Sequence, residues 1–145
     1  MYSTIKILIM MRRALVPVIL IGIGILLLVG CLHLSQPSVH FVRPVYGSTV
    51  PSGTVTVIVR VDNSSFNAGH DPHQGHLHYF LDRAAPIIPG EPAITQPGTY
   101  ASSTDTTYVW RNITAGRHTL SVELVNDDDT PYNPAVHDQI QIDVK

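Results

Sequence analysis

A period-two alternation of apolar and polar residues restricts the fold of this chain more than any other feature. In GTVTVIVRVD, residues 53–62, valine occupies every second position from Val55 to Val61, which makes one side of an extended chain apolar. HLHYFLD, residues 76–82, and RHTLSVELV, residues 117–125, alternate in the same way. This pattern is typical of half-buried β-strands rather than of amphipathic helices. We therefore expect a fold built of strands.

Proline and glycine divide the chain into short segments. Further strands are expected around Val39–Phe41, over residues 106–113 with Trp110, and over residues 139–145. The stretch 84–98, AAPIIPGEPAITQPG, holds four prolines and is predicted to be a surface connection. Residues 126–138, NDDDTPYNPAVHD, have the composition of a polar loop.

Six or seven short strands separated by such turns predict an all-β protein with a single immunoglobulin-like antiparallel β-sandwich, residues 39–145. The Cys…Trp…Cys signature of antibody domains is absent, so the expectation concerns architecture only. The side chains expected in the core are Val55, Val57, Val59, Leu77, Tyr79, Trp110, Leu120, Val122 and Ile142.

Residues 1–30 differ in composition from the rest of the chain and are predicted to be a signal sequence or a membrane anchor. Lys6, Arg12 and Arg13 precede a stretch without charge from Ala14 to Leu32. Basic residues followed by an apolar run are typical of export signals. The run is also close to the ~20 residues that span a bilayer as a helix, so an uncleaved N-terminal transmembrane helix is the alternative.

Cys31, the single cysteine, follows the apolar run directly, after Leu28-Val29-Gly30. This arrangement resembles the lipobox of exported prokaryotic lipoproteins, in which the cysteine is lipidated and becomes the mature N-terminus. Residues 31–38 would then form a polar tether. Either anchor, lipid or helix, places the domain on the extracytoplasmic face of the cell membrane. With one cysteine the domain has no internal disulfide.

The charge of the remaining chain argues against polyanionic partners. From Cys31 onward, six basic residues stand against eleven acidic ones, a formal net charge of −5. Nucleic acid and anionic lipid surfaces bind basic proteins, so neither is expected as a partner. The membrane, through the anchor, and a metal ion are the partners that the sequence suggests; it does not identify a protein or glycan partner.

Three stretches together resemble a family of small exported β-sandwich proteins of unknown function. They are VHFVRPVYGSTVPSGTVTVIVRV, GHLHYFLD and AGRHTLSVELVNDDDTPYNP, which lie between Val39 and Val144. Members carry a GHHH-type strand that ends in an acidic residue, and a closing hairpin with a late histidine. Here Leu77 replaces the middle histidine and Asp129 replaces the late one. The resemblance implies a fold and the location of a site, and it implies no activity.

His76 and His78 are the candidate core of a metal site. Two residues apart on a strand, they project from one face with side chains about 6–7 Å apart, and paired imidazoles can bind copper or zinc. His118 is the candidate third ligand. Three further histidines are held in reserve: His70, His73 and His137.

The alternation itself raises an objection to this ligand set. His118 shares a face with Leu120, whereas His76 and His78 lie on the face opposite Leu77, so the three converge only if a bulge shifts one strand. Phe80 shares the histidine face, which indicates that the proline-rich segment partly covers it. The alternative interpretation is that His76 and His78 hydrogen-bond this covering segment and His118 caps a hairpin.

Two other functions have less support in the sequence. Asp127, Asp128 and Asp129 offer oxygen ligands for Ca²⁺, but the twelve-residue loop of known calcium sites is missing and a charged hairpin tip is commoner. No G-x-S-x-G, H-E-x-x-H or P-loop pattern is present, and we do not expect an enzyme. The expected function is a binding module that takes copper or zinc through histidines; the alternative is a cell-surface protein- or glycan-interaction or structural domain without metal.

Overall fold

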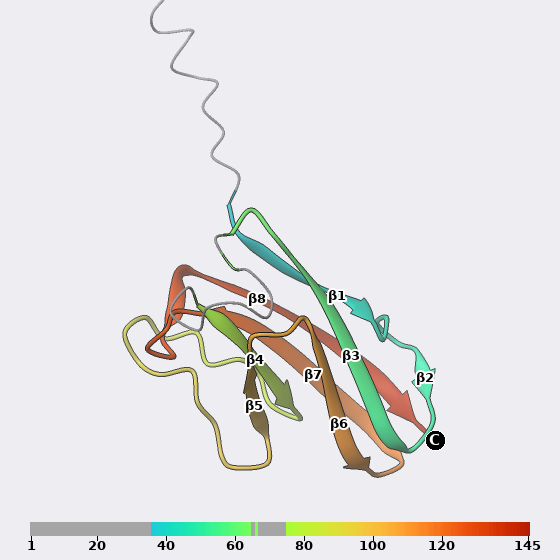
Figure 1. Cartoon of the computed structure of the whole chain (residues 1–145). Coiled ribbons are helices and arrows are strands. Elements are labelled where there is room, and N and C mark those ends of the chain that lie inside the picture. The colour runs from blue at the N-terminus through green and yellow to red at the C-terminus, as the bar shows by residue number, and fades with distance from the viewer. Residues whose placement is uncertain (1–35, 65, 67–74) are drawn as a thin grey trace, which may run out of the picture. The chain divides into compact units, whose positions relative to one another are not determined.

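The computed structural model describes residues 36–64, 66 and 75–145, and eight strands run through them (Figure 1). They are β1 (Ser38–Arg43), β2 (Thr49–Val50), β3 (Gly53–Asp62), β4 (His76–Leu81), β5 (Tyr100–Ser103), β6 (Thr107–Ile113), β7 (Gly116–Val125) and β8 (Pro131–Val144). The described residues contain no helix that is long and apolar enough to cross a membrane. The predicted leader and Cys31 lie outside these residues.

The strands form two sheets. One has the order β1-β3-β6, and the other has the order β2-β8-β7-β4-β5. Neighbouring strands are antiparallel, apart from the short parallel pairing of β2 with the end of β8. The prediction of an all-β fold is confirmed for the described residues.

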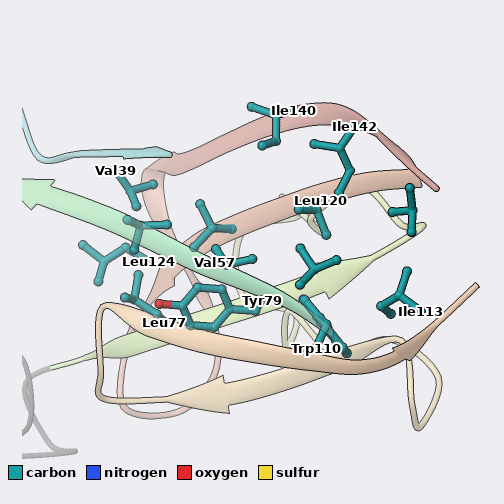
Figure 2. Packing of buried hydrophobic residues seen from close by; sticks show 14 of the residues in the cluster. Val39, Val57, Leu77, Tyr79, Trp110, Ile113, Leu120, Leu124, Ile140 and Ile142 are labelled. Atoms are coloured by element: carbon teal, nitrogen blue, oxygen red, sulfur yellow. The ribbon is translucent and has the colours of Figure 1, made fainter. Parts of the chain in front are cut away.

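The hydrophobic core lies between the two sheets, and side chains from both fill it (Figure 2). On β3 the alternating valines face inward, and Val57 is 1 % exposed, while Thr56 on the same strand is exposed. All nine side chains that the sequence placed in the core are buried there: Val55, Val57, Val59, Leu77, Tyr79, Trp110, Leu120, Val122 and Ile142. The period-two pattern therefore identified the inner faces of the strands correctly.

The outer face of the five-stranded sheet is also covered around β4. His78 and Phe80, which point away from the core, are fully buried, as is Ala93 in the segment that connects β4 to β5. This covering segment, residues 82–99, contains no strand and is drawn in yellow-green to yellow in Figure 1. The cover inferred from Phe80 is confirmed. It gives this sheet a second protected layer in which polar side chains are held away from water.

The C-terminal strand begins earlier than the sequence predicted. Residues 126–138 were expected to form a loop, but β8 starts at Pro131. Pairing with β7 extends to Leu124 and Val125, with a break in register between them. The prolines are tolerated because β2 pairs only with Asp143 and Val144, so that most of β8 has no second strand paired with it in the sheet among the described residues.

Candidate metal centre

Two histidines and one aspartate converge at the start of β4. The Nε2 atoms of His76 and His78 lie 3.0 Å apart. Oδ1 of Asp129 lies 2.9 Å from Nε2 of His76 and 3.1 Å from Nε2 of His78. Three potential ligand atoms thus form a nearly equilateral triangle, and each of them belongs to a residue type that binds transition metals.

The turn between β7 and β8 brings Asp129 to the pair. Asp129 has a left-handed backbone, φ 66°, a conformation that aspartate adopts more readily than most residues. Its N–H donates to the carbonyl of Asn126 at 3.1 Å, and its own carbonyl accepts from the N–H of Ala93 at 2.8 Å. Both ends of this residue are therefore fixed, so the direction of its carboxylate is set by the fold.

Ala93 also fixes the ring of His78. Nδ1 of His78 lies 2.7 Å from the carbonyl oxygen of Ala93. A carbonyl only accepts hydrogen bonds, so Nδ1 carries the proton and donates it. In the neutral ring Nε2 then presents its lone pair to Asp129 and His76. A histidine that donates one N–H to a carbonyl and offers the other nitrogen is oriented as metal-binding histidines usually are.

The electrostatic environment favours the neutral ring of His78. Burial lowers the pKa of His78 below its ordinary value of 6.5; the bond to Ala93 opposes the shift, the nearby ring of His76 adds to it, and Asp129 opposes it. The neutral ring has its Nε2 lone pair 3.1 Å from a carboxylate oxygen. Two acceptors at this separation repel each other unless a proton on Nε2 of His76, 2.9–3.0 Å from both, or a cation lies between them. A metal ion satisfies all three atoms at once.

The spacing of the three atoms suits a small transition-metal ion. Ligand atoms about 2.0–2.1 Å from a tetrahedral zinc ion lie about 3.3 Å from one another. The separations of 2.9–3.1 Å in the structure are shorter by only a few tenths of an ångström. His76, His78 and Asp129 would therefore hold such an ion through two nitrogens and one oxygen.

The structure does not bring His118, the expected third ligand, to this cluster. Its Nδ1 lies 2.9 Å from Oδ2 of Asp82, and its Nε2 lies 3.0 Å from the carbonyl oxygen of Thr114. The register between β4 and β7 is unbroken, and Val125 is the partner of His76. His118 is seven residues from Val125 along β7, about 23 Å at the rise of a strand. The three histidines therefore do not converge in the structure, and His118 instead links the start of β7 to Asp82.

None of the three reserve histidines is seen to join His76 and His78 among the described residues. His137 on β8 is exposed, and it pairs with Glu123 rather than with a residue of β4. His70 and His73 lie outside the described residues. The sequence offered Asp129 only as one of three consecutive aspartates that could bind Ca²⁺, and did not connect it with the histidine pair. The family resemblance contained the signal, because Asp129 stands where the late histidine was expected.

Comparisons with known proteins identify no relative by sequence. No family model and no curated protein matches the chain. Among solved structures, fibronectin(III)-like modules of Clostridium thermocellum CbhA are 19 % identical, with a TM-score of 0.46 over 76 % of this chain and 47 % of that one. A modular endo-β-1,4-mannanase from Cellulomonas fimi is 15 % identical, with a TM-score of 0.43 over 77 % of this chain and 19 % of that one. The chain thus spans less than half the length of either structure.

Proposed function

We propose that this chain is an extracytoplasmic β-sandwich module of immunoglobulin type that binds Zn²⁺ or Cu²⁺ through His76, His78 and Asp129. The observation that carries the proposal is the convergence of three ligand atoms within 3.1 Å of one another. The hydrogen bond that Nδ1 of His78 donates to the carbonyl of Ala93 orients the ring and supports the proposal further. Binding rather than catalysis is proposed, because the sequence contains none of the catalytic motifs considered above.

The chemistry of the ligands indicates which ions fit. Two imidazole nitrogens and one carboxylate oxygen suit zinc and copper(II), whereas calcium and magnesium prefer oxygen ligands alone. The neighbouring aspartates do not extend the site toward calcium. Asp128 bonds Thr130 through Oδ1, at 2.6 Å from its Oγ1 and 3.1 Å from its N–H, which lowers the pKa of the Asp128 carboxyl. The triple aspartate is therefore a hairpin tip that contributes one ligand.

We expect a series of alanine variants to separate the ligands from the other histidines. His76→Ala, His78→Ala and Asp129→Ala should each lower the affinity for Zn²⁺ by about 100-fold or more, because each removes an atom bound to the ion. Protons compete for the same nitrogens, so affinity should fall as the solution is acidified. Isothermal titration calorimetry on the full chain in detergent measures these constants. Mass spectrometry of the gently purified protein shows which metal it carries.

His118→Ala and His137→Ala are the matched controls for this series. Neither residue touches the three ligand atoms, so both variants should bind Zn²⁺ within about twofold of the original chain. Tight binding that survives the loss of His78 would contradict the proposed ligand set. Loss of binding in His118→Ala, with the fold intact, would point to a different site.

The proposed location rests on the leader. The apolar stretch and Cys31 support attachment to the outer side of the membrane through lipid, with an uncleaved helix as the alternative. Cys31→Ser should abolish the mass added by lipid and release the domain or leave the leader uncleaved. Mass spectrometry and membrane fractionation measure both. An unchanged mass with full membrane retention would favour the helix.

The second candidate function is a surface domain for protein or glycan interaction without metal. Exposed apolar side chains on the covering segment favour it, since Ile87, Ile88 and Ile94 are between 44 % and 55 % exposed. In that case His76 and His78 serve only to hold the covering segment in place. The absence of metal in the purified chain, together with no measurable Zn²⁺ or Cu²⁺ affinity, would leave this function as the better supported one. Membership of the GHHH-type family is likewise proposed, supported by the three stretches that resemble it, while Leu77 and Asp129 depart from its pattern.

A further inference from the structure

A fully buried acid on β7 has no role in the site as described so far. Glu123 is 0 % exposed, and neither of its carboxylate oxygens has a hydrogen-bond partner among the described residues. A buried carboxylate without a partner is costly, and natural folds rarely retain one without a function.

The pairing of the strands places Glu123 next to the proposed metal centre. It is the direct partner of His78 on β4, and the two side chains project from the outer face, opposite the core residues Leu77 and Val122. Directly opposed residues have Cβ atoms about 5 Å apart. The Glu123 carboxylate is not one of the three converging atoms. It therefore lies beside the cluster without completing it as a ligand.

The charges of the site give Glu123 a function. A divalent ion bound by two neutral histidines and the Asp129 carboxylate carries one uncompensated positive charge. His78 is 0 % exposed, so water cannot offset that charge from this side. A second carboxylate within the same buried layer balances it, and bound ions stabilise nearby anions in this way.

We propose that Glu123 is the buried counter-charge of the metal centre and makes the site selective for divalent over monovalent ions. The inference rests on the proposed function, because it requires an ion on His76, His78 and Asp129. Without the ion, Glu123 is an unpartnered acid in an apolar layer. With it, the ion and the two carboxylates form a neutral group.

The test replaces the carboxylate by a neutral group of the same shape. Glu123→Gln should lower the affinity of the full chain for Zn²⁺ by about 10–100-fold, the range seen for groups that support metal ligands without binding the ion. With Ag⁺ as a monovalent probe the affinity should fall much less, because a single positive charge is already balanced by Asp129. Titration calorimetry with a competing chelator measures both constants, and thermal unfolding without metal shows whether the fold is intact.

Two further variants secure the interpretation. Ser121 lies on the same face of β7 as Glu123, and its hydroxyl donates to the carbonyl of Arg83. Ser121→Ala should leave the affinities for Zn²⁺ and Ag⁺ unchanged. Glu123→Met, which has neither the charge nor an amide, should repeat the glutamine result because it removes the same charge; a different result would show that the amide disturbs packing. Equal falls for Zn²⁺ and Ag⁺, or no fall for Zn²⁺, would overturn the role of Glu123 while leaving the metal site in place. Failure of the original chain to bind Zn²⁺ would overturn both.

Discussion

Val57→Asp abolishes the cooperative thermal unfolding of the domain. Val57 is 1 % exposed at the centre of β3, opposite Tyr108 on β6, and belongs to the core between the sheets. A carboxylate there has no cation to pair with, and burying it costs several kcal/mol even if it takes up a proton. The total stability of a domain is only about 5–15 kcal/mol. Circular dichroism during heating should show no sigmoidal transition.

Thr56→Asp is the matched control for this prediction. It places the same acid one residue earlier on the same strand, where the side chain is exposed. A surface substitution of this kind usually changes the free energy of unfolding by less than about 0.5 kcal/mol, so the transition should stay close to that of the original chain. If Val57→Asp melted at the original temperature, the assignment of β3 to the core would be wrong.

We expect Gly75→Ala to destabilise the domain and to weaken the proposed metal centre together. Gly75 precedes β4 with φ +84°, and a Cβ atom there would lie 2.6 Å from the carbonyl oxygen of Val125 and 3.0 Å from Oη of Tyr132. The left-handed backbone alone costs about 1–2 kcal/mol for alanine, and the clash with Val125 forces the strand to move. His76 is the next residue, so we expect the affinity for Zn²⁺ to fall at least about tenfold.

Gly47→Ala separates the two causes. Gly47 also has a left-handed backbone, φ +73°, but a Cβ atom there meets nothing within 4 Å. Gly47→Ala should therefore lose only the part of the free energy of unfolding that comes from the left-handed backbone, and its affinity for Zn²⁺ should be unchanged. Unfolding in denaturant gives the free energies, and titration calorimetry gives the affinities. If both variants lost the same stability and neither lost affinity, the close approach at Gly75 would not matter.

The sequence predicted those parts of the fold that depend on local alternation. Residues such as Val57 and Tyr79 were placed in the core because every second side chain of a strand faces the same way. The strand β5, with the sequence YASS, was missed because it carries no such pattern. The early start of β8 at Pro131 was also missed. Proline predicts a loop locally, and only the pairing with β7 makes this segment a strand.

The candidate site was predicted only in part, for a related reason. The spacing of His76 and His78 follows from strand geometry, and their burial followed from Phe80. The third atom belongs to Asp129, 53 residues after His76. Its position depends on a turn conformation and on contacts with Ala93, and neither is encoded in a periodic pattern. The triple aspartate indicated this position only as a possible Ca²⁺ ligand, and the family resemblance indicated it as a replaced histidine.

The long unpaired side of β8 bears on how copies of this domain behave when they are crowded together. An open strand edge offers free N–H and C=O groups to which a strand of another molecule can add, and this is a common route to aggregation. In the described structure the register between β8 and β7 breaks between Leu124 and Val125 of β7. On β8 itself, Pro134 has no N–H to donate. An incoming strand therefore meets an interrupted row of donors. We expect the domain to remain free of edge-to-edge association at high local concentration.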